Sequence, residues 1–269
     1  MNYYSGKSIL ITGAASGLGR LMALEMGALG GNMVLLDIDH DGLQAVKNEM
    51  VGKNISVTTY VCDLSDRQQI YETTSQIDRV DILINNAGIV TGKYLLDTPD
   101  AMIEKTFQVN TLAHFWLVKS FLPGMLERNS GHIVSIASAG GLAASPKLTD
   151  YSSSKFAAIG FDESLRLELR KKGSLVKTTI VCPFYVNTGM FSGVKTRFNF
   201  LLPILKEEYV VKRIVKAIAK GKRRLIMPRF IYTIFPLRLL PVAMQDSILD
   251  FLGINKSMDD FLGRQETKT

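Results

Sequence analysis

Short apolar segments alternate with stretches of helical length along most of the chain, and this alternation limits the available folds more than any other feature. Val, Ile, Leu and Thr dominate six segments that we predict to be strands: 7–12, 32–37, 55–61, 81–85, 132–138 and 176–182. Their nearly continuous apolar character is typical of strands buried on both faces. The pattern indicates an α/β fold with a doubly wound, parallel sheet and right-handed crossovers.

The domain organisation follows from the same pattern. The chain has 269 residues, of which 46% are hydrophobic, so it can bury one large core. Long helices are expected at 99–128 and 150–172, the first with Thr98 as its N-cap and Pro99 at its first position. We predict a single domain over 1–269, in which 189–269 is a C-terminal extension outside the regular alternation.

A glycine-rich turn, "TGAASGLGR", joins the first strand to the first helix. Gly13, Gly17 and Gly19 allow a tight turn and let a pyrophosphate approach the N–H groups of the helix N-terminus. The second strand ends in Asp37, whose carboxylate can accept both adenosine ribose hydroxyls and repels a 2′-phosphate. This spacing predicts a Rossmann-type dinucleotide site that favours NAD over NADP, with Arg20 as the nearby cation that could weaken the preference.

The segment "DYSSSKFAAIG", residues 150–160, places Tyr151 and Lys155 one helical turn apart. A free tyrosine has a pKa of about 10, too high for ready proton exchange at neutral pH. A neighbouring ammonium is expected to lower that pKa. Taken alone, such a pair is more often a lysine that extends along an exposed helix surface.

Five motifs in order resemble those of the short-chain dehydrogenase/reductase family over nearly all of residues 6–190. They are the glycine turn, "CDLS" with Asp63, "NNAG" at 85–88, the Ser138–Tyr151–Lys155 set with Asn110, and "CPFYVNTGM" with Pro183 and Thr188. The resemblance implies a cofactor site made of Gly13, Ser16, Gly17, Leu18, Gly19, Asp37, Ile38, Asp63, Leu64, Asn86, Ala87, Gly88, Tyr151, Lys155, Pro183, Val186 and Thr188. Asp63 could instead simply begin the next helix.

The resemblance also implies a catalytic set. Tyr151 would exchange the proton while hydride passes to or from the nicotinamide, and Lys155 would hold the ribose hydroxyls. Ser138 would stabilise charge on the substrate oxygen, with Ser135 as its rival in the same strand. Asn110 resembles the residue that holds a water near Lys155, although it could be only a structural group bonded to the main chain.

The substrate is expected to be lipophilic. Residues after Thr188 correspond to the family's mobile substrate lid, and they are strongly apolar: Phe191, Phe198, Phe200, Leu201, Leu202, Ile204 and Leu205. Four segments, including "YSSSKFAAIGF" and "FLGINKSMDDF", are similar to the branch of epidermal-type retinol dehydrogenases and lipid-droplet 17β-hydroxysteroid dehydrogenases. The resemblance implies a retinoid-, steroid- or aryl-alcohol-like substrate and a homodimer or homotetramer formed through the two long helices.

Positive charge is concentrated in one region. The segment 194–241 contains twelve Lys or Arg residues against Glu207 and Glu208, so it carries +10 while the whole chain carries +7. The stretch "LIMPRFIYTIFPLRLLPVAM", residues 225–244, overlaps the end of this segment and fits either packing in the core and a subunit interface or peripheral contact with a membrane surface. A non-catalytic dinucleotide sensor or nucleic-acid-binding protein is the alternative function, but a sensor has no need of Ser138, Tyr151 and Lys155 together.

The remaining features are expected to be structural. Cys62 and Cys182 each follow an apolar run, which is typical of free, buried thiols in a reducing compartment. His40, His114 and His132 have no metal-ligand spacing, so we expect no metal site. No apolar region precedes a cleavage site near the N-terminus and no apolar run reaches the length of a membrane span, so we expect a cytoplasmic protein, or one peripheral on a membrane.

Overall fold

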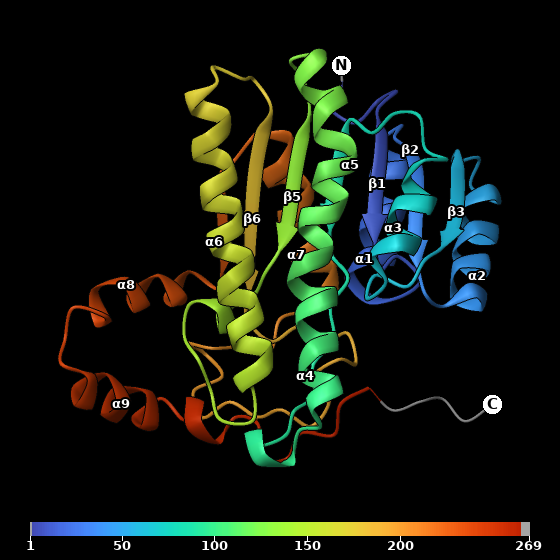
Figure 1. Ribbon diagram of the computed structural model, residues 1–269. Helices are drawn as coiled ribbons and strands as arrows, with labels where there is room; N and C mark the ends of the chain where they lie inside the picture. The colour runs from blue at the N-terminus through green and yellow to red at the C-terminus, as the bar shows by residue number, and fades with distance from the viewer. Residues whose placement is uncertain (1, 265–269) are drawn as a thin grey trace.

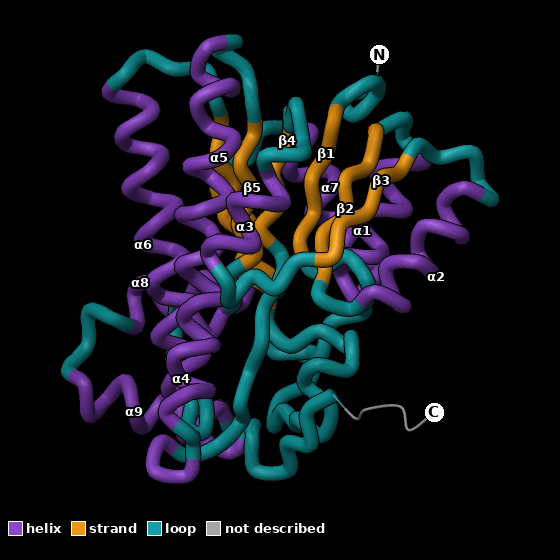
Figure 2. The backbone as a smooth tube through the Cα atoms, turned by 45° about the vertical axis from the view of Figure 1, so that its right-hand side comes forward, coloured by secondary structure: helices purple, strands orange, loops and turns teal. Residues whose placement is uncertain are grey.

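The computed structural model describes residues 2–264 and consists of one parallel sheet between two layers of helices (Figures 1 and 2). The strands are β1 (Ser8–Thr12), β2 (Asn32–Asp37), β3 (Val57–Val61), β4 (Ile82–Asn85), β5 (His132–Ile136), β6 (Lys177–Pro183) and β7 (Arg224–Met227). Their order in the sheet is β3-β2-β1-β4-β5-β6-β7, and every pair is parallel. The predicted doubly wound fold is therefore confirmed.

Helices cover both faces of the sheet. The α-helices are α1 (Gly17–Ala28), α2 (His40–Val51), α3 (Arg67–Thr74), α4 (Asp100–Phe107), α5 (Ala113–Glu127), α6 (Thr149–Lys171), α7 (Glu207–Ala219), α8 (Ile234–Leu237) and α9 (Val242–Phe251). Short 3₁₀ turns are η1 (Leu95–Asp97), η3 (Ala139–Gly141), η4 (Arg229–Thr233) and η5 (Ile254–Lys256), and η2 (Gln108–Leu112) is a π turn. Helices α1, α2 and α7 pack on one face, whereas α3, α5 and α6 pack on the other (Figure 2).

The central strands are largely apolar because successive side chains enter different cores, whereas the edge strand β3, with the sequence VTTYV, is only partly buried. Ile9 and Ile11 of β1 pack with α1 and α7, while Leu10 packs with α3 and α5; all three are fully buried. The order of the strands reverses between β1 and β4. In such sheets the crevice outside the carboxyl ends of the strands, at this reversal, is the usual place for a ligand.

The extension beyond residue 189 is more regular than the sequence suggested. Helix α7 returns the chain to the sheet, and β7 pairs in parallel with β6. The prediction that residues 189–269 lie outside the alternation is therefore wrong for residues 207–227. Strand β7 has only four residues and begins within the basic segment, so its apolar run is too short to stand out.

The first long helix also differs from its predicted form. Pro99 has ψ 140°, which is not helical, so it is the N-cap of α4 and the helix begins at Asp100. The Thr98 hydroxyl donates to the Tyr94 carbonyl oxygen instead of capping the helix. The stretch to Glu127 is then interrupted by the π turn η2, which carries Asn110.

Histidines and cysteines lie largely in the core. Cys62 and Cys182 are free and buried. Burial lowers the pKa of His114 and of His132 to about 3, so both rings are neutral at physiological pH. His132 hydrogen-bonds Tyr3 and Thr179, whereas the His114 ring nitrogens have no hydrogen-bond partner among residues 2–264.

Candidate active site

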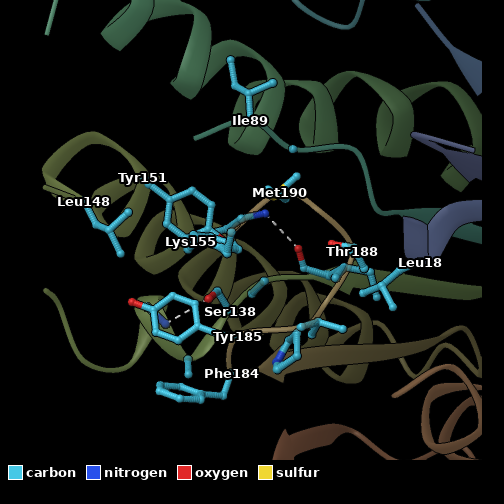
Figure 3. Close-up of a pocket in the computed structure, with 18 of the residues that line it drawn as sticks. Leu18, Ile89, Ser138, Leu148, Tyr151, Lys155, Phe184, Tyr185, Thr188 and Met190 are labelled. Carbon is cyan, nitrogen blue, oxygen red and sulfur yellow. Dashed lines mark hydrogen bonds between the residues drawn. The ribbon is translucent and has the colours of Figure 1, made fainter. Parts of the chain in front are cut away.

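A cavity of about 370 Å³ opens at the carboxyl ends of the strands, beside the point between β1 and β4 where the strand order reverses. Its wall contains the predicted cofactor residues apart from Gly19, together with Ser138, Tyr151 and Lys155. One end is polar and is formed by the turns after β1, β2 and β3. The other end is lined by apolar side chains that follow β6 and β7. Phe184, Tyr185 and Met190, which follow β6, are labelled in Figure 3.

The glycine turn brings backbone close to backbone. Gly13 has φ +65°, and a Cβ there would lie 2.8 Å from the Cα of Ala87. A Cβ at Gly19 would overlap the carbonyl oxygen of Gly13, so Gly19 supports the turn from behind. The Asn86 amide donates to the carbonyl oxygens of Thr12 (2.9 Å) and Gly13 (3.2 Å), which ties the turn to the loop after β4.

The N-terminus of α1 faces this turn, and its chemistry fits an anionic group. Within residues 2–264, the N-cap residue Ser16 makes no side-chain capping bond, and the first turn holds no acidic residue. The first N–H groups and the helix dipole are therefore available to a phosphate. The chemistry of this helix N-terminus therefore suits a dinucleotide pyrophosphate.

The carboxylate of Asp37 lies at the end of β2, beside the polar end of the cavity. It accepts from the N–H groups of Ala15 (2.9 Å) and Asp39 (3.1 Å), and these bonds fix its orientation. Arg20, the cation that could have weakened the expected preference for NAD, is paired with Glu49 of α2. Asp37 therefore faces the cavity while the nearby positive charge is directed to another carboxylate.

Asp63 lies at the end of the next strand. Its Oδ1 accepts from the N–H and the hydroxyl of Ser65 at 2.8 and 2.7 Å, and Lys105 lies 3.9 Å from its other oxygen. Partial burial acts to raise the pKa of Asp63, but the Ser65 bonds and Lys105 outweigh it and hold the pKa below its ordinary value. Asp63 is the second residue of the loop after β3 and lies at the cavity wall; α3 begins four residues later at Arg67, with Asp66 as its N-cap, so Asp63 does not begin that helix.

Tyr151 and Lys155 project from adjacent turns of α6 on the side facing the cavity (Figure 3). They are 5% and 3% exposed, so they are not a surface pair. The Lys155 ammonium lies 5.7 Å from the Tyr151 ring centroid and donates to the carbonyl oxygen of Ile136 at 3.0 Å. The placement agrees with the pattern expected from their spacing.

The electrostatics of the pair differ from the expectation. Burial raises the pKa of Tyr151 to about 12, opposed by the Ser138 hydroxyl, and burial lowers the pKa of Lys155 to about 8. The expected lowering of the Tyr151 pKa by the ammonium is therefore wrong for this structure, because removal from water is the larger effect. The phenol is held in its protonated form at neutral pH.

Ser138 lies two residues beyond the end of β5, as the N-cap of η3, and its hydroxyl accepts from the Gly140 N–H at 3.0 Å. It lines the cavity with Tyr151. Its rival Ser135 is wholly buried inside the strand. The structure thus brings Ser138, and not Ser135, to the site.

Asn110 lies behind the cavity wall, and its side chain joins three segments. Its oxygen accepts from the Ile89 N–H at 2.8 Å, and its amide donates to the Ile89 carbonyl (2.9 Å) and to the Ser154 hydroxyl (3.0 Å). A Cβ at Gly88 would lie 3.2 Å from the Asn110 oxygen and 3.3 Å from the Lys155 nitrogen. Asn110 therefore holds the loop after β4 against α6, which agrees with the structural alternative for this residue.

The apolar end of the cavity was predicted only in part. Of the expected lid side chains, Phe191 and Leu202 line it; Leu205 is buried in the core, and Phe198 packs against Phe200 and Phe251. The wall includes further side chains that the sequence did not reveal, among them Phe184, Tyr185, Phe230, Ile231, Leu237 and Leu249. Their apolar character is evident in the sequence. That they meet at one cavity depends on how η4, α8 and α9 fold back towards the active site.

A Rossmann-type sheet with a glycine turn, an acidic residue after β2 and a buried Tyr–Lys pair defines a nicotinamide-dependent oxidoreductase. The "short chain dehydrogenase" family matches residues 7–197, and the chain belongs to this short-chain dehydrogenase/reductase family. It is an NAD(P)-dependent alcohol dehydrogenase or carbonyl reductase. The comparisons give no support to a non-catalytic sensor or a nucleic-acid-binding protein.

Several curated relatives are similar over almost the whole chain. "Short-chain dehydrogenase/reductase family 16C member 6" of Bos taurus is 44% identical, covering 98% of this chain and 85% of the relative. "Epidermal retinol dehydrogenase 2" of Homo sapiens is 45% identical, with coverages of 97% and 87%. "Retinol dehydrogenase 10" of Homo sapiens is 40% identical, with coverages of 98% and 87%.

Solved structures share the fold. A short-chain dehydrogenase/reductase from Burkholderia phymatum in complex with NAD superposes with a TM-score of 0.80 at 27% identity, covering 91% of this chain and 97% of that one. A metagenomic short-chain oxidoreductase in complex with NADP gives 0.70 at 26% identity, with coverages of 84% and 98%. Members of the family thus bind either dinucleotide.

Proposed function

We propose that the protein interconverts a lipophilic alcohol and its ketone or aldehyde, with NAD as its cofactor and Tyr151 as its acid/base. The observation that carries the proposal is the side-by-side burial of Tyr151 and Lys155 at the junction of a polar and an apolar compartment. The dinucleotide, when bound, supplies or accepts the hydride at its nicotinamide ring. The chain supplies binding, orientation and the proton.

Each catalytic group has a distinct task. In the reductive direction the Tyr151 hydroxyl gives its proton to the substrate oxygen, and in the oxidative direction the same oxygen takes it back. The raised pKa of Tyr151 suits the donor state at neutral pH. The Ser138 hydroxyl would donate to the substrate oxygen as negative charge develops there, and Lys155 would hold the ribose hydroxyls of the bound cofactor beside Tyr151.

The preference for NAD over NADP is supported by charge. A 2′-phosphate at the end of β2 would lie beside the Asp37 carboxylate, which two backbone N–H groups hold in place. Arg20 is engaged by Glu49 and would have to leave that partner to compensate. Both features oppose the extra phosphate of NADP.

The substrate class is supported by the apolar wall and by the relatives. Aromatic and aliphatic side chains of the segments after β6 and β7 surround the space next to Tyr151. Burial of apolar ligand surface in such a space is favourable by roughly 25 cal/mol per Å². Two of the similar proteins are named as retinol dehydrogenases, which fits a long lipophilic alcohol here.

A substrate panel tests this function. Formation of NADH from NAD, and of NADPH from NADP, is measured in parallel with retinoids, steroids, and aryl and aliphatic alcohols. Tyr151→Phe keeps the ring and removes the hydroxyl, so we expect turnover to fall by roughly 10²–10⁴-fold while NADH binding remains. Tyr232→Phe, at an exposed tyrosine of η4, is the matched control. Normal turnover by Tyr151→Phe would exclude the proposed acid/base role.

Peripheral membrane contact is a second part of the proposal. No helix between residues 2 and 264 has the length and apolar character to cross a bilayer. Helices α8 and α9 project from the body in Figure 1, and Leu239, Val242 and Phe251 there are 86%, 69% and 61% exposed. Exposed groups of this kind can enter the interfacial region of a lipid surface. We expect the protein to float with phospholipid vesicles and Leu239→Ser/Val242→Ser to float less; equal flotation would count against contact through these helices.

The third part of the proposal is that the protein forms a homo-oligomer through α5 and α6. Phe115 of α5 and Leu167 of α6 are 40% and 51% exposed on these two long helices. Exposed apolar side chains on neighbouring helices favour self-association. Light scattering of the wild type and of Phe115→Ser/Leu167→Ser tests this, and a monomeric wild type would exclude it.

A further inference from the structure

The C-terminal segment, residues 254–262, lies across the loops that carry the catalytic residues. It contains η5 and ends at Leu262, whose N–H donates to the Ser192 carbonyl oxygen at 2.9 Å. Within it Met258 is 1% exposed and belongs to the same buried cluster as Tyr151 and Tyr185. The segment is therefore part of the active-site core and not a peripheral tail.

One side of the C-terminal segment is bound to the loop that leads into α6. The Ser145 hydroxyl donates to the Ile254 carbonyl oxygen at 3.0 Å. The Lys147 ammonium donates to the carbonyl oxygens of Met258 and Asp259, each at 3.2 Å. Lys147 has φ +62°, a conformation that residues other than glycine rarely adopt, and it lies four positions before Tyr151.

The other side is bound to the loop after β6. The Lys195 N–H donates to the Ser257 carbonyl oxygen at 3.2 Å, and the Tyr185 hydroxyl is hydrogen-bonded to the Ser257 hydroxyl at 2.9 Å. A Cβ at Gly193, where φ is +87°, would overlap the Asp260 carbonyl oxygen. The two loops are thus connected through the C-terminal segment.

Phe261 extends this connection to the third loop and to the catalytic tyrosine. Its ring packs on Gly92, in the loop after β4, so closely that a methyl group there would overlap it. The Phe191 ring lies between Phe261 and Tyr151, with centroid distances of 6.3 and 5.6 Å, and it meets Tyr151 edge-on at 79°. Phe191 lines the cavity, whereas Phe261 supports it from behind.

We propose that Phe261 is a positioning residue, which holds Phe191 against Tyr151 and thereby sets turnover and the size of alcohol that the site accepts. The inference rests on the proposed function, because it concerns the same tyrosine. Without the Phe261 ring, Phe191 can move away from Tyr151 and the phenol loses one of its walls. Small displacements of this kind matter, since a misplacement of about 1 Å can cost about a hundredfold in rate.

Gly92→Ala and Phe261→Ala test the inference from two sides. The first displaces the ring and the second deletes it; both should lower kcat about tenfold or more and raise the relative activity on bulkier alcohols. NADH affinity should be unchanged, because Phe261 does not line the cavity. Phe261→Leu, which retains an apolar group, should recover part of kcat.

Gly173→Ala is the matched control. Gly173 has φ +66°, close to the φ +69° of Gly92, but no atom lies within 4 Å of a Cβ placed there. The control therefore imposes the same backbone strain without touching the C-terminal segment. Its kcat should equal that of the wild type.

The outcomes separate the two proposals. A wild type that turns over no alcohol or carbonyl compound overturns the proposed function. A wild type that turns over, with Gly92→Ala and Phe261→Ala equal to it in kcat and alcohol selectivity, overturns only the role of Phe261. A merely structural role would lower the melting temperature and the folded fraction while leaving kcat per folded molecule unchanged, and that result also overturns it. If Phe261→Ala does not fold, the kcat and alcohol selectivity of Gly92→Ala and Phe261→Leu decide whether Phe261 has the proposed role.

Discussion

Asp37→Asn should weaken the discrimination against NADP. The substitution removes the negative charge at the end of β2, while the remaining amide oxygen can still accept from the Ala15 N–H, now 2.9 Å from the carboxylate. Two unit charges about 4 Å apart interact by about 4 kcal/mol at an effective dielectric constant of about 20. Because Asp37 is only partly buried, solvent screening reduces this value.

The screened repulsion gives the expected size of the effect. We take the screened repulsion between Asp37 and the 2′-phosphate as about 1.4–2.8 kcal/mol. Its removal should lower the ratio of kcat/KM for NAD to kcat/KM for NADP about ten- to a hundredfold. Most of the change should be a gain with NADP, and NAD should lose only the fraction due to a weaker ribose hydrogen bond. Initial rates with both cofactors at a fixed alcohol concentration provide the assay.

Asp41→Asn is the control for Asp37→Asn, because Asp41 lies nearby in the first turn of α2 and its side chain is 98% exposed. Its cofactor ratio should match the wild type. The reasoning is refuted if Asp37→Asn leaves the ratio unchanged, or if the wild type itself prefers NADP. The second result would mean that Arg20 leaves Glu49 to meet the 2′-phosphate.

Two further predictions concern catalysis and stability. Ser138→Ala should lower kcat roughly 10²–10³-fold while NADH binding is retained, whereas Ser135→Ala, made in the core strand, should leave kcat near the wild-type value; equal effects would contradict the assignment. The pKa of His114 is lowered to about 3 by burial, so the unfolded chain binds the extra proton between about pH 6.5 and 3, and the free energy of unfolding should fall as pH falls through that window. His114→Leu should reduce this loss by about 2 kcal/mol between pH 6.5 and 5 in denaturant titrations; an unchanged slope would mean that His114 is protonated in the folded protein.

The sheet and the cofactor end could be predicted because local sequence determines them. The glycine turn, the acid at the end of β2 and the "NNAG" segment each follow a strand directly, so the topology of a parallel sheet brings them to one edge. Tyr151 and Lys155 are related by the helix period alone. Nothing about distant packing was needed for these assignments.

The substrate end could not be predicted to the same depth. Phe261 and Gly92 are far apart in the sequence, and their contact depends on the path of the whole C-terminal segment. Strand β7 could not be predicted, because its four residues lie within a basic stretch and its apolar run is short. The pKa of Tyr151 depends on burial by side chains from several loops, so the spacing of a single pair gave the wrong direction.

The residues that carry the proton transfer and those that select the substrate lie on parts of the fold that differ in rigidity. The Tyr–Lys pair belongs to α6, a helix of 23 residues packed along the sheet, and the Lys155 ammonium is also bonded to the Ile136 carbonyl oxygen. The substrate wall comes from loops and short helices after β6, and α9 has no fully buried residue. Changes there can alter the accepted alcohol without moving the proton donor, provided that the C-terminal segment still holds Phe191 in place. Substitutions at Phe261 should therefore change both rate and selectivity, whereas substitutions at Leu249, which lines the cavity, should change selectivity alone.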